Sequence, residues 1–230
     1  MFTKEFDFPS GIVIPVDKPY EWTSSDVVRK IKIPLKKLGF KNIKIGHAGT
    51  LDPLATGVLL ICVGKATKSA EALQSEAKEY VTTIELGAVT PSYDLEHVVS
   101  ERFPYEHITR EAVEEALRSF IGEQEQIPPI FSAKLIDGKR AYDYAREGKE
   151  VEMRKAIVTF YEMELLDFSL PKITIRMKCS KGTYVRSVAR DLGLMLGSGG
   201  YLTDLIRTKS GRYNVKECYK LEDVIKILEQ

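Results

Sequence analysis

Residues 46–64 read GHAGTLDPLATGVLLICVG, and this stretch decides the fold of the chain. Its second half, residues 57–64, is a short apolar run bounded by glycines, which indicates a β-strand covered on both faces rather than a surface helix. Its first half is rich in turn-forming residues and carries one carboxylate, Asp52, directly before Pro53. The stretch therefore predicts a glycine-rich loop with a single acid at the mouth of a buried strand.

The patterns on either side of this stretch predict an α+β protein with a mostly antiparallel sheet. Strand-like runs are separated by scattered helices, without a regular β-α-β alternation. The expected strands lie in residues 11–19, 57–64, 80–87, 156–170 and the first part of 172–197. No repeat, low-complexity tract or long linker interrupts the chain, so we expect one domain over residues 1–230.

Three helices are expected between and after these strands. Residues 23–39 predict a helix with Ser24 or Ser25 near its cap and an interruption around Pro34. Residues 109–122 predict a helix capped by Thr109 and ended by a glycine, with its apolar residues on one side. The strand that begins at residue 172 is expected to pass into a helix from about Val185.

The composition sets the broad class of protein. The chain has 230 residues, 43% of them hydrophobic, which is enough for a substantial core. No apolar run approaches the ~18 to 20 residues of a membrane span, and the amino terminus carries acids where a signal peptide carries bases. We therefore expect a soluble, cytoplasmic protein. Cys62, Cys179 and Cys218 are far apart, which argues against a disulfide framework and a zinc site.

The charged residues are segregated along the chain although the net charge is only +1. Residues 27–51 and 171–190 contain no acid, whereas glutamates gather in residues 96–125. The basic residues of the two acid-free stretches are Arg29, Lys30, Lys32, Lys36, Lys37, Lys41, Lys44, Lys172, Arg176, Lys178, Lys181, Arg186 and Arg190. The pattern suggests a basic face that binds phosphates, although runs of charge are also typical of solvated faces.

The local pattern around Asp52 has two interpretations. An aspartate before a proline is common in turns and at helix caps, where the proline takes the first helical position. Gly46, Gly49 and Gly57 favour a functional loop instead, because glycine permits unusual backbone angles and a close approach of another backbone. The spacing alone leaves both interpretations open.

The sequence resembles the TruB family of bacterial tRNA pseudouridine-55 synthases in five ordered blocks that span nearly the whole chain. The blocks are VDKPYEWTSSDVV (16–28), GHAGTLDPLATGVLLICVGKATK (46–68), KEYVTTIELG (78–87), QIPPIFSAKLIDGKRAYDYAREG (126–148) and CSKGTYVRSVARDLG (179–193). The second block resembles the catalytic motif of the family.

This resemblance implies the pseudouridine synthase fold, with a mixed, mostly antiparallel sheet flanked by helices and loops around a central RNA-binding cleft. It implies that one uridine in the T-loop of tRNA is isomerised to pseudouridine without a metal or organic cofactor. We expect a monomer with no obligatory protein partner. We expect no small C-terminal PUA-type domain of the kind that many relatives carry, and we therefore expect the affinity for tRNA to depend on the catalytic domain.

The resemblance also assigns three catalytic residues. Asp52 matches the essential aspartate, which acts on the ribose or base or assists a glycal intermediate. Sugar hydrolases typically need two carboxylates, but here no water is added and uracil remains the next reactant, so one acid suffices. Arg186 matches the arginine that pairs with this aspartate and lowers its pKa. Tyr80 matches the tyrosine that stacks on the base and removes the C5 proton.

Three further residues are expected to bind the substrate. A base inside a folded T-loop must leave its stack to reach Asp52. His47 matches the residue that inserts where the flipped base had been. Tyr184 and Leu205 match an aromatic and an apolar wall of the pocket. Lys65 and Lys68, with the two basic stretches, are expected to contact phosphates.

Two departures from the family pattern concern loops. Tyr20 and Glu21 stand where a glycine often follows Lys-Pro, and residues 89–97, VTPSYDLEH, lack the glycine that commonly ends this element. Three alternative functions remain: a glycosidase or nucleosidase, which requires a second carboxylate; a non-catalytic tRNA-binding or folding module; and the guide-dependent archaeal and eukaryotic branch of the superfamily.

Overall fold

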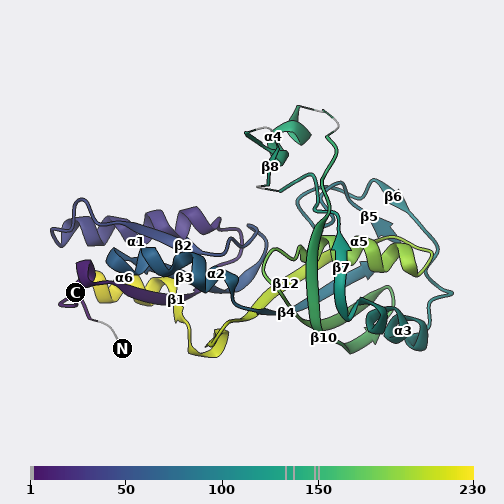
Figure 1. The fold of residues 1–230 in the computed structure, drawn as a ribbon. Coiled ribbons are helices and arrows are strands. Elements are labelled where there is room, and N and C mark those ends of the chain that lie inside the picture. The colour runs from purple at the N-terminus through teal and green to yellow at the C-terminus, as the bar shows by residue number, and fades with distance from the viewer. Residues whose placement is uncertain (1–2, 133, 137, 148, 150) are drawn as a thin grey trace. The chain divides into compact units, whose positions relative to one another are not determined.

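The computed structural model describes residues 3–132, 134–136, 138–147, 149 and 151–230 (Figure 1). The chain forms two compact units. The first unit consists of Met1–Tyr80 and Leu205–Gln230, and the second consists of Val81–Asp204. Strands β4 (Lys78–Leu86) and β12 (Gly200–Ser210) run from one unit into the other. The expected single domain over residues 1–230 stays a prediction.

The first unit is built on a mixed sheet in the order β14-β1-β3-β12. Strand β3 pairs antiparallel with β1 and β2 and parallel with β12, and β14 runs parallel to β1. The bounds of the other elements are η1 Phe8–Ser10, β1 Ile12–Lys18, α1 Ser24–Lys37, β2 Ile45–Ala48, β3 Thr56–Val63, η2 Gly64–Ser69, α2 Ala70–Ser75, β13 Tyr213–Asn214, η3 Val215–Glu217, β14 Tyr219–Lys220 and α6 Leu221–Glu229.

Strand β3 is the centre of this unit and confirms the interpretation of its apolar run. Every residue after Thr56 is buried in β3, because other strands flank it on both edges and side chains cover both of its faces. Leu60 and Cys62 belong to a core cluster with Ala48 of β2. The loop that carries Asp52 therefore ends in a buried strand of the unit.

Helix α1 confirms the expected helix but corrects two details. Its N-cap is Thr23, whose side chain accepts a hydrogen bond from the backbone N–H of Asp26, while Asp26 accepts one from Thr23 in return. The expected interruption around Pro34 is wrong, because the helix continues to Lys37. Pro34 lies in the last turn, where a missing N–H costs one hydrogen bond, and its ring is buried.

The second unit places helices α3 and α5 with an antiparallel sheet in the order β4-β11-β10-β7 (Figure 1). Helix α3 packs against β10 and α5, and its cap is Thr109 as expected. The bounds are β5 Ala88–Val89, β6 Glu101–Arg102, α3 Arg110–Phe120, β7 Gly122–Gln126, β8 Leu135–Ile136, β9 Lys139–Arg140, α4 Ala141–Arg146, β10 Ala156–Ser169, β11 Lys172–Cys179 and α5 Val185–Met195. The α+β class is confirmed.

No helix among the described residues is long and apolar enough to cross a membrane. Three positions of the fourth sequence block, Ala133, Asp137 and Gly148, lie outside the described residues.

Candidate active site

Asp52 lies on the loop between β2 and β3 of the first unit. The loop turns at Pro53, where the backbone N–H of Ala55 donates to the carbonyl of Asp52 at 3.1 Å, and β3 begins at Thr56. No helix follows Pro53, so the helix-cap interpretation of Asp52 is wrong. Asp52 is half-buried, whereas its neighbour Leu51 is buried and fixes the loop to the core.

Two side chains from the first sequence block, residues 16–28, hold this loop by its backbone. The Ser24 hydroxyl accepts from the N–H of Leu51 at 2.9 Å and donates to its carbonyl at 3.1 Å. The Lys18 ammonium donates to the carbonyl of Pro53 at 3.0 Å and to the carbonyls of Pro19 and Trp22. Ser24 and Lys18 therefore hold the backbone of Leu51 and Pro53, the residues on either side of Asp52.

The turn after Lys18 includes the first departure from the family pattern. Glu21 has a φ of 64°, in the left-handed region that favours glycine. The backbone thus takes the conformation that a glycine would take, although the side chain is that of glutamate. A glutamate at this position therefore strains the backbone at Glu21. The turn nevertheless keeps the chain path that places the Trp22 carbonyl next to the Lys18 ammonium.

Arg207 of β12 ties the beginning of the loop to the strand that follows it. Its guanidinium donates to the carbonyls of Gly49 at 3.0 Å and Thr50 at 3.4 Å, and to the carbonyl of Val58 at 2.7 Å. The residue is only 1% exposed. Because Gly49 and Val58 flank the whole turn around Asp52, one planar side chain fixes both ends of the loop.

Gly57 is required where β3 meets the strand that carries Arg207. The two residues are partners in the parallel register of β3 and β12. Gly57 has a φ of +98°, and a Cβ built on it would lie 2.3 Å from the carbonyl oxygen of Arg207. No other residue can take this place without moving one of the two strands.

Lys18 and Arg207 bring buried positive charge under the loop. Neither forms an ion pair with a carboxylate among the residues that the structure describes, and Lys18 is 1% exposed. Burial lowers the pKa of Lys18 to about 8, the Asp52 carboxylate opposes this shift, and Arg207 adds to it. Asp52 is the carboxylate with the largest effect on Lys18, so it is the main counter-charge for the buried cation.

The other site residues predicted in the first unit lie on its strands. His47 is on β2 opposite Ile61 of β3, and its Nδ1 atom is buried without a hydrogen-bond partner among the described residues. Burial and, secondarily, Arg207 lower the pKa of His47, so its imidazole is neutral at neutral pH. Tyr80 on β4 is 8% exposed, and Leu205, two residues before Arg207 on β12, is 8% exposed.

The predicted residues of the second unit lie at the start of α5. The buried Arg186 guanidinium has Nε 3.6 Å from an Asp94 oxygen, and its Nη1 donates to the carbonyl of Ser92 at 3.3 Å. Tyr184 is the N-cap of α5. The Gln126 side chain accepts a hydrogen bond from the backbone N–H of Tyr184 at 2.8 Å and donates one to its carbonyl at 3.2 Å. The pairing of Arg186 with Asp52 stays a prediction.

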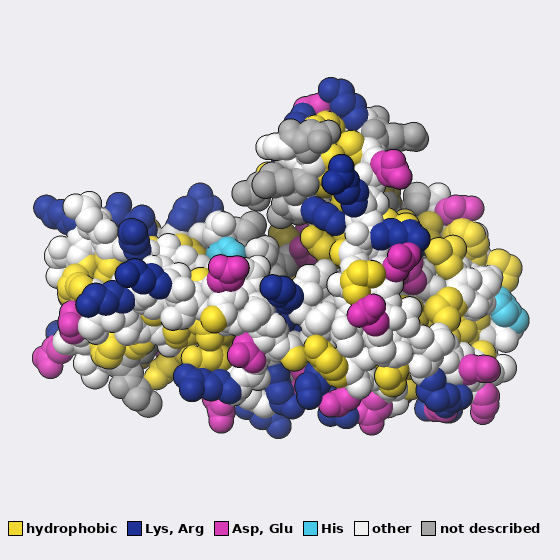
Figure 2. All heavy atoms as spheres, in the orientation of Figure 1, with side chains coloured by type: hydrophobic (Ala, Val, Ile, Leu, Met, Phe, Trp, Pro, Cys, Tyr) yellow, Lys and Arg dark blue, Asp and Glu magenta, His cyan; other side chains and the backbone are white. Residues whose placement is uncertain are grey.

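The two basic stretches differ in their surroundings. In the first unit, six exposed or half-buried lysines form no ion pair with a described carboxylate. They line two open grooves of about 700 and 640 Å³, and Figure 2 shows Lys and Arg side chains gathered over this region. The six are Lys32, Lys36, Lys41, Lys44, Lys65 and Lys68.

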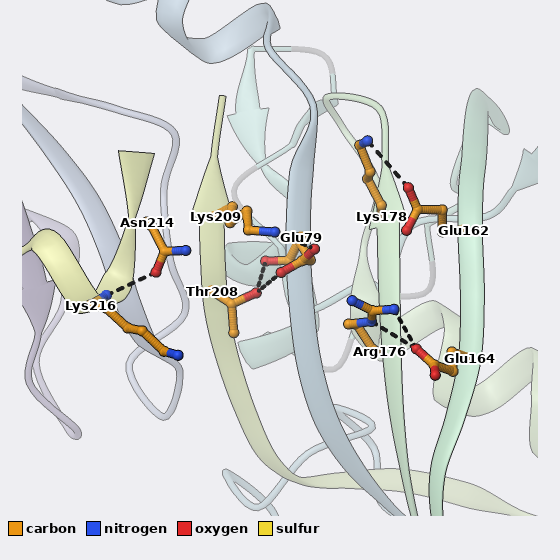
Figure 3. A network of polar contacts seen from close by, with 9 residues as sticks. All are labelled: Glu79, Glu162, Glu164, Arg176, Lys178, Thr208, Lys209, Asn214 and Lys216. Atoms are coloured by element: carbon orange, nitrogen blue, oxygen red, sulfur yellow. Dashed lines mark hydrogen bonds and ion pairs between the residues drawn. The ribbon is translucent and has the colours of Figure 1, made fainter. Parts of the chain in front are cut away.

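In the second unit, the cations of β11 have partners on neighbouring strands. Arg176 bonds Glu164 at 2.5 Å and Lys178 bonds Glu162 at 3.3 Å (Figure 3), while Lys172 lies 3.9 Å from Glu85. Because carboxylates already neutralise these side chains, the structure favours the first stretch over the second for phosphate contacts.

Comparison with known proteins identifies the family. The model of the "TruB family pseudouridylate synthase (N terminal domain)" matches residues 36–185, and that of the "tRNA pseudouridylate synthase B C-terminal domain" matches residues 186–230. The chain belongs to the TruB family of pseudouridylate synthases. It is therefore an enzyme, a pseudouridine synthase.

Individual relatives agree with this assignment. A protein of Phocaeicola vulgatus named tRNA pseudouridine synthase B is 55% identical over 97% of this chain and 96% of its own length. A protein of the same name from Parabacteroides distasonis is 50% identical over the same shares. A crystal structure of a Cbf5–Nop10–Gar1 complex contains a chain with a TM-score of 0.73 and 29% identity. The synthase matches that chain over 97% of its own residues but spans only 56% of the other chain.

Sequence reasoning missed three residues that hold the site. Lys18 lies in the first sequence block and Arg207 lies two residues after Leu205, but a strand lysine and a strand arginine are ordinarily expected at the surface. Asp94 lies within residues 89–97, the loop that departs from the family pattern. The signal that could have found the two cations is their place in apolar strand runs, where an unpaired charge needs a reason. No cluster of metal-ligating side chains occurs among the described residues.

Proposed function

We propose that this synthase converts uridine 55 in the T-loop of tRNA to pseudouridine, acting in the cytoplasm as a monomer and without a cofactor. Family membership and the names of relatives that are about 50% identical over nearly their full length support action on tRNA. The single observation that carries the proposal is the loop of Asp52, which three buried side chains fix by its backbone. A fixed loop with one acid suits a reaction in which that acid must be aimed.

The reaction is an isomerisation, so no atom is added from outside. The bond between C1′ and N1 breaks, the uracil turns while it is held, and C1′ bonds to C5. The proton on C5 then leaves, and N1 ends with a proton. Asp52 assists the cleavage, either as a nucleophile on the ribose or base or by helping a glycal to form. Tyr80 takes the C5 proton.

Asp52 must be ionised for this role. Lys18 and Arg207 are buried cations of the same unit, and Asp52 is the carboxylate with the largest effect on the pKa of Lys18. We propose that Arg186 pairs with Asp52 and orients its carboxylate, while the ion pair with Asp94 holds the Arg186 guanidinium. The guanidinium suits this task because it presents donors on more than one edge.

The reacting base must be extruded from the T-loop. We propose that His47 fills the gap in the RNA, and its neutral, half-buried imidazole is suited to contact stacked bases. Tyr184 and Leu205 form walls for the flipped base. The six lysines that line the two grooves of the first unit contact the RNA backbone.

The test compares the wild type with Asp52→Asn on a tRNA transcript that carries 5-tritiated uridine. The variant Glu5→Gln, purified in the same way, is the control. We expect tritium release from the wild type and the control and a loss of at least about 1000-fold in the variant. Release by the variant at the wild-type rate would remove Asp52 from the mechanism. Binding of tRNA without release by either protein would favour a non-catalytic folding module. A transcript with uridine 55 replaced by cytidine tests the position.

A further inference from the structure

The loop of residues 89–97 departs from the family pattern at its last position, where His97 replaces the common glycine. The loop is a fixed turn in the second unit. Thr90 Oγ1 donates to the carbonyl of Asp94 at 2.7 Å and accepts from its N–H at 3.1 Å. Tyr93 adopts a left-handed φ of 58°. The backbone thus presents Ser92, Asp94 and His97 in one defined arrangement.

These three side chains form a chain of hydrogen bonds from His97 through Ser92 to Asp94, and Asp94 forms an ion pair with Arg186. Asp94 Oδ2 lies 3.6 Å from Arg186 Nε, and Asp94 Oδ1 accepts from the Ser92 hydroxyl at 2.5 Å. The Ser92 oxygen lies 2.9 Å from His97 Nδ1. A hydroxyl has one hydrogen, and Ser92 gives it to Asp94, so the Nδ1–H of His97 must donate to Ser92.

The ring of His97 is held in place from its other side. It lies against the ring of Phe131, with centroids 4.4 Å apart and planes inclined by 47°. Phe131 belongs to the fourth sequence block, so His97 connects that block to the Asp94–Arg186 pair. Ser92 is fully buried and Asp94 is 5% exposed, which leaves the hydroxyl little choice of partner once His97 fixes it.

We propose that His97 is a positioning residue for the isomerisation. Its Nδ1–H orients the Ser92 hydroxyl, the hydroxyl fixes the Asp94 carboxylate, and the carboxylate sets the direction of the Arg186 guanidinium. Without the donor on His97, the Ser92 oxygen loses an acceptor bond and the carboxylate gains rotational freedom. The inference rests on the proposed function, because Arg186 is there the partner of Asp52.

Three variants separate the donor from the ring. His97→Phe keeps the contact with Phe131 and removes the donor, whereas His97→Asn keeps a donor near the position of Nδ1 and removes the ring. Ser92→Ala removes the link itself. Each variant and the double variant His97→Phe/Ser92→Ala are assayed for kcat and KM by tritium release from tRNA, and their melting temperatures are measured.

We expect kcat to fall about three- to tenfold in His97→Phe and Ser92→Ala, with KM within about twofold of the wild type. His97→Asn should keep kcat within about twofold, and the double variant should equal Ser92→Ala, because both changes cut the same chain. A wild-type kcat in His97→Phe, or a loss in His97→Asn that equals the loss in His97→Phe, overturns the inference. Absence of release by the wild type instead overturns the proposed function.

Discussion

The two units of the synthase differ in the partners of their buried cations and of the surface cations considered for phosphate contacts. In the first unit, the buried Lys18 and Arg207 bond only to backbone carbonyls, and the surface lysines of the two grooves have no carboxylate partner among the described residues. In the second unit, the buried Arg186 faces Asp94. The surface cations Arg176 and Lys178 also have glutamate partners (Figure 3).

The difference indicates where a negatively charged group from outside is expected. Buried charge without a partner is costly, so it persists where another group or a ligand uses it. Under the loop of the first unit, the group that uses it is Asp52, the carboxylate with the largest effect on Lys18. At the surface of the same unit, the natural partner of unpaired lysines is the phosphate backbone of RNA.

The largest effect is expected at Gly57, where β3 pairs with β12. Gly57→Ala places a methyl group against the carbonyl of Arg207 at a φ that alanine disfavours. We expect unfolding to become easier by about 3 kcal/mol and kcat to fall at least about 100-fold. Gly46→Ala is the matched control, since nothing lies within 4 Å of its Cβ position. Denaturant unfolding and tritium release check both variants. Equal behaviour of the two would contradict the close approach of Gly57 to the Arg207 carbonyl as the critical contact.

A smaller effect is expected when the planar guanidinium of Arg207 is replaced by another positively charged group. Arg207→Lys cannot reach the carbonyls of Gly49 and Val58 together, so we expect a loss of about 2 kcal/mol in stability and about tenfold in kcat. Arg212→Lys, at an exposed position near the end of β12, is the control. Wild-type kcat in Arg207→Lys would mean that charge alone suffices and that the fork geometry is unimportant.

The elements that carry their own signals could be predicted from the sequence. The apolar run of β3, the Thr109 cap of α3 and the change from strand to helix at Val185 are all present. Pro34 was misinterpreted because burial of its ring in the last turn of α1 is a tertiary effect. The contacts of Lys18, Arg207 and Asp94 could not be predicted, since hydrogen bonds to backbone carbonyls and pairs of distant residues leave no periodic pattern.

The roles of Asp52, Tyr80, Arg186, His47, Tyr184 and Leu205 come from the family resemblance and stay predictions. Their local surroundings could not be predicted, because the pattern around Asp52 fits a turn, a helix cap or a functional loop equally well. The helix-cap interpretation is wrong because β3, and not a helix, begins at Thr56. The same limit applies to the two basic stretches, which look alike in sequence and differ only in the carboxylates that the fold brings to them.

The buried charge of Lys18 predicts a modest dependence of stability on pH. Its pKa is lowered from 10.5 to about 8, so the unfolded chain binds more protons than the folded protein between these values, and folding becomes more favourable as pH rises. We expect the wild type to gain about 1 kcal/mol relative to Lys18→Met between pH 7.5 and 9.0. Denaturant unfolding at both pH values measures this difference. An unchanged or opposite difference would contradict a buried ammonium whose pKa is lowered by burial.

The comparison of the two units is tested most directly by the salt dependence of tRNA binding. Two triple variants remove three charges each: Lys36, Lys41 and Lys44 to Gln in the first unit, and Lys172, Arg176 and Lys178 to Gln in the second. Filter binding gives Kd over a range of salt concentrations. We predict that the first variant weakens binding several-fold and reduces the slope of log Kd against log salt by about 2, while the second leaves the slope unchanged. Equal slopes in the two variants, or a larger change in the second, would contradict the account.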